Sequence, residues 1–459
     1  MEFQVTSPVD GSVCASYQFM PWNKVNELLD EAGAAQTKWA ALPQDERLSI
    51  LSRWIELIAE KSEDLCRELT MQMGRPCSEA PEELEEFVLR SKRVLEMTPQ
   101  VMVRSETRTE GTVERYTSAE PLGVVMVEAG WNYPYIICAH SVVPALAVGN
   151  AVLLSASNQT PTCSQNLCAA FREAGGPEGV LEPLFINRAV TERLFRSERI
   201  SQVVLTGALP TEEVKSASQR RYLGLGLDLG GKDPAYVRAD ADLELAARRL
   251  AKAAFTNAGQ SCCGVERIYV HESVHDPFLE ALKSEVENLV LGDPRKPETT
   301  LGPMVRFQSA AAVYDQVSAT INQGARPLLP DKPPERAYFN PQILADVDQT
   351  MKLMTEETFG PAVGVMRVAG DQKAIELMAD CKYALGTSIW TKDVERGLEL
   401  VRQINTYDSS VNYCDYLDPA IAFLGVKGSQ RGFTLSRFGF EMLTRSRTYW
   451  IDRGNSSAS

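Results

Sequence analysis

The side chain with the clearest potential for chemistry is that of Cys262, the first of two adjacent cysteines in a turn punctuated by glycine. A helical pattern over residues 243–255 leads into this turn, and Asn257 and Gly259 end the helix. The thiolate form of cysteine is the nucleophile, and a nearby positive charge stabilises it. Because Arg267 follows shortly after, the sequence favours a reactive thiol over a buried, inert cysteine.

Three further segments hold polar side chains that could assist a thiol. Asn132 stands between a predicted strand and a predicted helix, where its amide could hold an oxyanion. Asp228 stands in a glycine-rich corner, where a carboxylate could act as a general base. Glu357 precedes a Gly-Pro turn, and its carboxylate could accept hydrogen bonds from ribose hydroxyls. Taken singly, each residue is more typical of a surface turn.

A zinc site is a competing interpretation. The segment His271-Glu-Ser-Val-His275 fits the H-E-x-x-H pattern of zinc peptidases, which needs both imidazoles on one helical turn. Here His271 closes an apolar strand pattern, and Pro277 follows His275 closely. Since His140 is the one remaining histidine, we expect no metal site.

The composition narrows the class of protein. A chain of 459 residues predicts two or three domains. A net charge of −14 argues against nucleic acid or an anionic membrane as a partner. The ten cysteines do not form a disulfide pattern, the N-terminus does not match a signal peptide, and no apolar run of ~18 residues occurs. The sequence therefore predicts a cytoplasmic protein.

The elements that must position these residues follow two α/β series. Residues 24–98 predict three helices, with 47–72 as one of them. Between residues 121 and 230 short apolar runs alternate with helices, which predicts a doubly wound nucleotide-binding sheet. A second α/β series runs from residue 267 to 390. Residues 109–118 alternate like an exposed β ribbon, which favours oligomerisation because open strand edges attract partners.

Taken together and in this order, the segments resemble the aldehyde dehydrogenase superfamily over essentially the whole chain. The motifs of the resemblance are Phe255-x-Asn257-x-Gly259-Gln260-x-Cys262, Leu229-Gly-Gly-Lys232, Glu357-x-Phe359-Gly-Pro361 and Trp131-Asn132-x-Pro134. The short chain and Leu301-Gly-Pro-Met304 are most similar to bacterial-type succinate semialdehyde dehydrogenases.

The resemblance implies a division into three parts. A nucleotide-binding domain comprises residues 1–104 and 119–230, and a catalytic α/β domain comprises residues 231–425. Residues 105–118 and 426–459 form a small β oligomerisation ribbon and tail. The resemblance also implies a homodimer or homotetramer.

The resemblance further implies the chemistry. Cys262 attacks an aldehyde to give a thiohemiacetal. Asn132 and the backbone N–H of Cys262 hold the oxyanion, and hydride passes to NAD or NADP. Asp228, at the position of the family's glutamate, activates the water that hydrolyses the thioester. The family spacing selects Cys262, and not Cys263, as the nucleophile. The implied cofactor-binding residues are Trp131, Ser155, Asn158, Gly207, Ala208, Leu229, Glu357 and Phe359.

Several positions depart from the family pattern. Asp228 is one methylene shorter than glutamate, and a misplacement of ~1 Å can cost about 100-fold in rate. Ser155 replaces the lysine that meets the adenosine ribose, and Asn158 replaces a nearby acid, so NADP becomes admissible. Glu212 replaces a glycine where pyrophosphate is expected. Two alternatives remain open: a coenzyme A-acylating enzyme that uses the same cysteine, and a catalytically impaired relative that acts as a scaffold.

Overall fold

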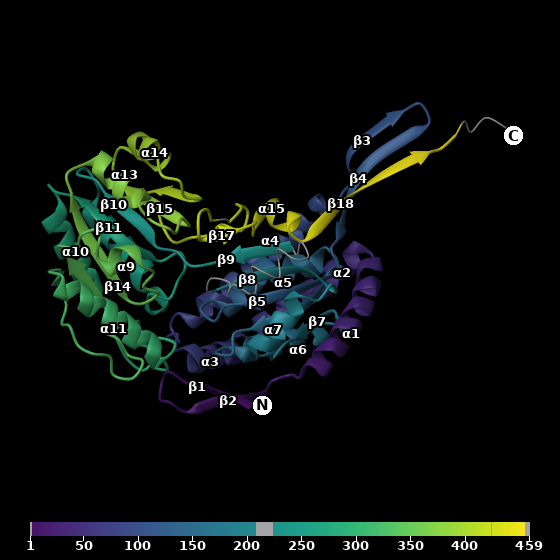
Figure 1. The fold of residues 1–459 in the computed structure, drawn as a ribbon, viewed down its shortest axis with the longest axis horizontal. Helices are drawn as coiled ribbons and strands as arrows, with labels where there is room; N and C mark the ends of the chain where they lie inside the picture. The colour runs from purple at the N-terminus through teal and green to yellow at the C-terminus, as the bar shows by residue number, and fades with distance from the viewer. Residues whose placement is uncertain (1, 208–223, 424, 455–459) are drawn as a thin grey trace.

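Two largely parallel sheets, each covered by helices, form two lobes in the computed structural model, which describes residues 2–207, 224–423 and 425–454 (Figure 1). The first sheet has the order β17-β9-β8-β5-β6-β7, and the second has the order β12-β13-β14-β11-β10-β15-β16. Antiparallel strands stand only at the edges of these described sheets, namely β17 and β12. The predicted doubly wound α/β class is confirmed.

The strands of the first sheet are β5 (Val124–Ala129), β6 (Ala151–Ala156), β7 (Leu181–Pro183), β8 (Ile200–Thr206), β9 (Gly224–Asp228) and β17 (Gln430–Arg431). Those of the second sheet are β10 (Asp233–Val237), β11 (Val265–His271), β12 (Arg326–Pro327), β13 (Gln342–Ala345), β14 (Ala362–Val368), β15 (Gly386–Trp390) and β16 (Asp408–Val411).

The first sheet packs with the helices α1 (Trp22–Ala41), α2 (Gln44–Glu60), α3 (Ser62–Met73), α4 (Ala80–Val101), α5 (Pro134–Ala147), α6 (Pro161–Glu173), α7 (Arg188–Phe195) and α15 (Ser436–Glu441). The second packs with α9 (Leu243–Phe255), the 3₁₀ turn η1 (Thr256–Gly259), α10 (His275–Glu287), α11 (Phe307–Asn322), α12 (Lys352–Thr355), α13 (Asp371–Ala379) and α14 (Val394–Val401).

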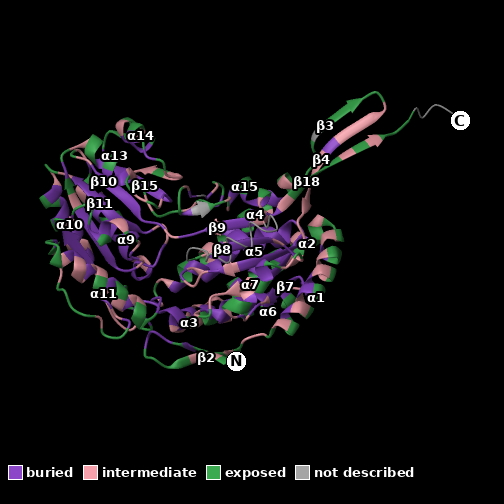
Figure 2. Cartoon of the chain, viewed as in Figure 1, coloured by how far each residue is buried: buried purple, intermediate pink, exposed green. Residues whose placement is uncertain are grey.

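Burial explains why the central elements are so apolar. Residues 124–127 of β5 and 151–154 of β6 are buried on both faces because helices cover both sides of the sheet (Figure 2). The helix α5 is buried along nearly its whole length and has apolar residues on every side. Such a rigid core fixes the positions of the loops at the strand ends.

One prediction for the N-terminal helices is wrong. The stretch 47–72, predicted as a single helix, forms α2 and α3, so that residues 22–101 contain four helices instead of three. The chain leaves the helical conformation at Lys61, and a new helix begins at Ser62 with Glu63 and Asp64 in its first turn. Acidic side chains stabilise the start of a helix, which explains the new beginning.

The predicted ribbon is confirmed as a three-stranded sheet that projects from the lobes (Figure 1). It comprises β3 (Ser105–Glu110), β4 (Val113–Pro121) and β18 (Thr444–Asp452), and β18 pairs with β4 over its full length. Trp450 on β18 is 68% exposed. A separate two-stranded sheet, β1 (Glu2–Thr6) with β2 (Val13–Gln18), lies at the N-terminus.

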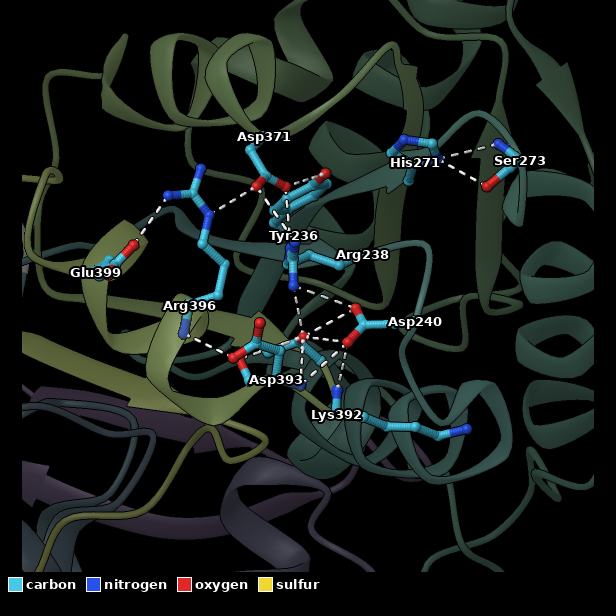
Figure 3. A network of polar contacts seen from close by, with 11 residues as sticks. Tyr236, Arg238, Asp240, His271, Ser273, Asp371, Lys392, Asp393, Arg396 and Glu399 are labelled. Atoms are coloured by element: carbon cyan, nitrogen blue, oxygen red, sulfur yellow. Dashed lines mark hydrogen bonds and ion pairs between the residues drawn. The ribbon is translucent and has the colours of Figure 1, made fainter.

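The carboxyl edge of the second sheet is filled by a network of ion pairs (Figure 3). Asp371 at the start of α13 accepts hydrogen bonds from Arg238 (3.0 Å), Arg396 (3.1 Å) and the hydroxyl of Tyr236 (3.1 Å). Asp240 accepts from the hydroxyl of Thr391 and from two backbone N–H groups after β15. The network ties the loops that follow β10, β14 and β15 to one another.

The two histidines of the H-E-x-x-H segment lie on different elements. His271 ends β11 and its ring contacts Ser273, whereas His275 is the buried first residue of α10. In the described part of the chain, no group of His, Cys, Asp and Glu side chains has the arrangement of a metal site. Within the same residues, no helix is long and apolar enough to cross a membrane.

Candidate active site

The predicted site residues come together where the carboxyl edge of the first sheet meets the amino edge of the second. From the first sheet, Asn132 follows β5 and Asp228 ends β9. From the second sheet, Cys262 precedes β11, and Glu357 and Phe359 precede the adjacent strand β14. Each lobe therefore contributes part of one site.

Two cavities open on either side of this meeting point. One, of about 640 Å³, runs along the carboxyl ends of β5, β6 and β8 and is called here the nucleotide cleft. The other, of about 430 Å³, lies between α4, α5, α9 and residues 413–417 and is called the second cavity. Asn132, Thr206, Asp228 and Cys262 line both. Molecules in the two cavities therefore reach the same thiol, amide and carboxyl groups.

The turn before Cys262 is held in a conformation that few residues adopt. Asn257, Ala258 and Gly259 have φ angles of 55°, 54° and 69°. A side chain on Gly259 would come within 2.3 Å of the Gly360 carbonyl, so the two loops pass in close contact. The Gln260 side chain secures the turn, because it donates to the Asn257 carbonyl (2.9 Å) and accepts from the Val305 N–H (2.8 Å). Such strain persists where the surroundings enforce it, commonly at functional sites.

The thiol of Cys262 is half-buried and opens into both cavities. Its sulfur lies 3.7 Å from that of Cys263. A hydrogen bond from Cys263 lowers the pKa of Cys262, but burial and the carboxylates of Asp228, Asp233 and Glu357 outweigh it and raise that pKa above its ordinary value. The thiol is therefore protonated at neutral pH and needs a base to become a nucleophile.

The prediction that Arg267 stabilises the thiolate is wrong. The Arg267 side chain is buried and donates to the carbonyls of Lys232 (3.1 Å), Leu377 and Met378. The guanidinium caps the carboxyl end of α13 rather than approaching Cys262.

The amide of Asn132 is buried and firmly positioned. The backbone carbonyl of Asn132 accepts hydrogen bonds from Arg75 (2.5 Å) and from the Asn257 side-chain amide (3.1 Å), and the Asn132 side-chain nitrogen donates to the Gln260 backbone carbonyl (3.3 Å). Arg75 in turn forms a buried ion pair with Glu83. Among the described residues, none accepts a hydrogen bond from the Cys262 backbone N–H. The amide and this N–H are two donors that an oxyanion could use.

The carboxyl group of Asp228 is buried without a stabilising partner. Its Oδ1 atom has no hydrogen-bond partner within the described part of the chain, and burial raises the pKa of Asp228 to about 7. Backbone pairing fixes its position, because Asp228 lies opposite Gln430 of β17 and Leu229 donates to the Ser429 carbonyl (2.8 Å). A carboxyl group that titrates near neutral pH is suited to general base catalysis.

Glu357 and Phe359 form the opposite wall of the nucleotide cleft. The Gly231 N–H donates to Glu357 (2.8 Å), and burial, with Glu266 nearby, raises the pKa of Glu357 to about 7. The Phe359 ring meets Trp131 edge to face at 5.6 Å. The Glu266 carboxylate accepts from the backbone N–H groups of residues 358 and 359 and is paired with buried Lys232 at 2.6 Å.

The remaining predicted cofactor residues line the same cleft. Ser155 and Asn158 lie at the end of β6, and Gly207 follows β8, with Leu229 close by. Ala208 and Glu212 lie outside the described residues. Sequence reasoning missed Arg75, Glu83 and Glu266, whose partners are distant in the chain, and Glu128, an acid at the end of β5 that also lines the cleft.

A dinucleotide fits the nucleotide cleft. The volume of about 640 Å³ falls within the range of about 300–1,000 Å³ that cofactor pockets occupy. The cleft lies beyond the carboxyl ends of parallel strands, where doubly wound sheets bind nucleotides. A side chain at Gly230 would come within 2.3 Å of Glu357, so glycine leaves room for the carboxylate that can meet a ribose.

Comparisons with known proteins agree with this arrangement. The family model described as the aldehyde dehydrogenase family matches residues 1–449. A succinate semialdehyde dehydrogenase of Escherichia coli (strain K12), named for NAD(P)+, is 30% identical over 441 residues, which cover 95% of each chain.

Solved structures show the same fold. An NADP-dependent glyceraldehyde-3-phosphate dehydrogenase from Bacillus halodurans C-125 in complex with NADP matches with a TM-score of 0.94 and 27% identity over 99% of this chain and 96% of that one. An indole-3-acetaldehyde dehydrogenase in complex with NAD+ matches with a TM-score of 0.92 and 27% identity, covering 98% and 93% of the two chains.

Proposed function

The chain belongs to the aldehyde dehydrogenase family, and from this we propose that it oxidises an aldehyde to a carboxylic acid with NAD or NADP through the thiol of Cys262. The observation that supports the mechanism most is that Cys262, Asn132 and Asp228 line both cavities. A thiol, an amide and a carboxyl group thus stand between a cleft that fits a dinucleotide and a cavity that can admit an aldehyde.

The first step is attack by sulfur on the aldehyde carbon. Asp228, whose pKa of about 7 leaves about half of it ionised at neutral pH, takes the proton from the Cys262 thiol. The sulfur then bonds to the carbonyl carbon, and the oxyanion accepts hydrogen bonds from Asn132 and the Cys262 N–H. When bound, NAD or NADP supplies the acceptor for the hydride that leaves this carbon.

The second step is hydrolysis of the thioester on Cys262. Asp228 first releases its proton to solvent and then takes one from a water molecule, which attacks the acyl carbon, so that the Cys262 sulfur leaves as a thiolate. The carboxylic acid is then released. Glu357, held by the Gly231 N–H, orients the nicotinamide ribose, while the Phe359 ring packs beside it.

Reduction of NAD or NADP by a panel of aldehydes tests the function. We expect the absorbance of reduced nicotinamide to rise with wild-type protein and not with Cys262→Ala. Reduction that requires coenzyme A would identify the acylating alternative. A reactive Cys262 with no reduction by any aldehyde would identify the scaffold alternative and refute the proposal.

For the aldehyde, we propose one without a carboxylate. Succinic semialdehyde is an obvious candidate because a relative is named for it. However, the buried cations of the second cavity already have acidic partners: Arg75 pairs with Glu83, and Arg90 pairs with Glu86. A substrate carboxylate would compete with them and meet the carboxyl groups of Glu79 and Asp415, for which the described residues provide no ion-pair partner.

Butanal and succinic semialdehyde form a matched pair for this proposal, since they share a four-carbon chain. Desolvation of an unpaired carboxylate predicts that kcat/KM is at least about tenfold higher for butanal. The opposite order would show that Arg249 or Lys252 at the cavity mouth receives the carboxylate.

We propose that the ribbon of β3, β4 and β18 joins copies of the chain into a homodimer or homotetramer. The ribbon projects from the lobes and exposes Trp450, and an exposed strand edge favours pairing. Light scattering coupled to size exclusion should give a mass of two or four chains, which Trp450→Asp should reduce. A monomer for the wild type at micromolar concentrations would contradict this.

We also propose that the division at residues 104, 118, 230 and 425 describes the domains, because the strands of the two sheets, apart from the edge strand β17, lie within the ranges assigned to nucleotide binding and catalysis. Limited proteolysis should cut near these limits, and cuts inside the sheets would argue against them.

All ten cysteines are free thiols, which supports a cytoplasmic location. Cell fractionation tests that location, and recovery outside the cytoplasmic fraction would exclude it.

A further inference from the structure

Glu128 is an acid at the end of an otherwise apolar strand. It is the penultimate residue of β5, and residues 124–127 before it are buried. In the part of the chain that the structure describes, its carboxyl group has no hydrogen-bond or ion-pair partner, and burial raises its pKa to about 7. A half-buried carboxyl group without a partner is costly, so a role in binding a ligand would explain its presence.

The carboxyl group opens into the nucleotide cleft. Glu128 lies opposite Ser155 of β6 and Leu205 of β8 in the parallel ladders. Directly paired residues on adjacent strands point to the same face of a sheet. All three residues line the cleft, which confirms this direction.

Glu128 stands beside β6 in the first sheet, whereas the thiol belongs to the second sheet. Cys262 and Glu357 line the cleft from the second sheet, and residues of β6 and α7 line it from the first lobe. On the function proposed above, on which this inference rests, the nicotinamide must lie beside Cys262. The adenosine half of the cofactor then extends toward β6 and α7, and its ribose comes to the carboxyl ends of β5 and β6.

The charges at this end disfavour an additional phosphate. Arg188 is the one cation among the described residues that line the cleft, and it is already paired with Glu192 at 3.1 Å. Glu128 therefore adds a negative charge that no described lining residue offsets.

We propose that Glu128 is the residue that selects NAD over NADP, because its carboxylate accepts hydrogen bonds from the adenosine ribose hydroxyls and repels a 2′-phosphate. An acid near the ribose has this effect in doubly wound folds generally. The sequence admits NADP because Asn158 stands where the family has an acid. The structure assigns the acidic function instead to the neighbouring strand β5.

Titration calorimetry of the full-length protein with NAD and with NADP tests the proposal without reference to turnover. We expect wild-type protein to bind NAD at least about tenfold more tightly than NADP. Glu128→Gln removes the charge but keeps the shape, so it should weaken NAD, strengthen NADP and lower the ratio of affinities by about tenfold.

A matched control is Glu198→Gln, which removes the same charge from an exposed site on this lobe that does not line the cleft, and it should leave both affinities unchanged. ADP-ribose, which lacks nicotinamide, should lose as much affinity as NAD does in Glu128→Gln. Equal binding of NAD and NADP by the wild type, or an unchanged ratio in Glu128→Gln, would overturn the assignment. Failure of both dinucleotides to bind would instead refute the proposed function itself.

Discussion

The two parallel sheets of this enzyme end differently at their carboxyl edges. In the first sheet this edge opens into the nucleotide cleft, where Glu128 and Asp228 have carboxyl groups with pKa values raised to about 7 by burial. In the second sheet the same edge is closed by the network around Asp371 and Asp240 (Figure 3). Parallel strands offer a crevice at their carboxyl ends, but a ligand can use it only where polar groups still lack partners.

The second sheet contributes its candidate site residues from its amino edge, opposite the ion-pair network. Cys262 and Glu357 precede β11 and β14, so the thiol lies at the amino ends of these strands. The candidate active site is thus built from the carboxyl edge of one sheet and the amino edge of the other. Substitutions at the candidate active site should therefore change catalysis, whereas substitutions in the network at the carboxyl edge of the second sheet should change stability.

The largest effect should come from Cys262→Ala. Without its nucleophile the enzyme should lose at least about 10⁴-fold in kcat, because binding alone cannot replace covalent catalysis. Calorimetry should show that NAD affinity changes little, since the thiol is one of many groups that line the cleft. Substantial turnover in this variant would show that the nucleophile does not lie at the amino edge of the second sheet.

Asp228→Asn should reduce kcat by about 100-fold or more, because amide cannot act as a base. At high pH, where the Cys262 thiol ionises without a base, intact-mass spectrometry should detect the acyl group on Cys262 in this variant, because the thioester still lacks the base for its hydrolysis. In the wild type, kcat should rise with pH through about 7, as Asp228 loses its proton. An unchanged steady-state rate would assign the base to another residue.

The same variant should be more stable than the wild type. The folded pKa of Asp228 is about 7, against about 3.9 in an unfolded chain. The folded state therefore binds more protons between these values, and the wild type loses stability as pH rises from about 4 to about 7. The stability advantage of Asp228→Asn should grow over that window and then level off, which thermal melts can follow. A constant advantage at all pH values would show that the carboxyl group is not buried as described.

Asp371→Asn tests the network at the carboxyl edge of the second sheet. This substitution should change the stability of the protein without changing kcat. The substitution leaves Arg238 and Arg396 without their anion, which should cost about 1–3 kcal/mol of unfolding free energy at neutral pH. Burial would raise the pKa of Asp371, but hydrogen bonds from the two arginines lower it further. The cost should therefore fade as the pH falls below about 4, where the wild type loses the same charge. A large loss of kcat would show that the carboxyl edge of the second sheet also contributes to catalysis.

The smallest effect should come from Cys263→Ala. The hydrogen bond from Cys263 lowers the pKa of Cys262, so its loss should move alkylation of Cys262 by iodoacetamide to higher pH. We expect kcat to fall by no more than about threefold, because a methyl group in place of the thiol removes only one weak hydrogen bond. Complete inactivation would mean that Cys263 takes part in the reaction.

The sequence contains recognisable motifs for the segments that meet around Cys262, because close backbone contacts constrain their residue types. Gly259 must be glycine where its loop meets Gly360, and a side chain at Gly231 would strike the Cys262 carbonyl at 2.0 Å. Such constraints leave recognisable motifs around Cys262. The α/β class was predictable for a similar reason, since buried parallel strands need continuous apolar runs.

The sequence does not reveal side-chain contacts that form only in the tertiary structure. Arg75 reaches the backbone of Asn132, and Glu266 reaches residues 358 and 359, across separations that carry no local pattern. The direction of the Arg267 side chain depends on strand alternation within the folded sheet. Glu128 ends an apolar strand, where an acid is ordinary, and only the ladder to Ser155 reveals its place in the cleft.

The pairing of β17 with β9 makes the position of Asp228, the proposed general base, depend on a segment that is synthesised much later. Asp228 has the backbone of residues 429–431 alongside it, and β4 gains its second partner only when β18 has been made. During synthesis on the ribosome, both sheets can therefore assemble before the centre is complete. A message ended early by a late stop codon would yield two nearly whole lobes and no working enzyme.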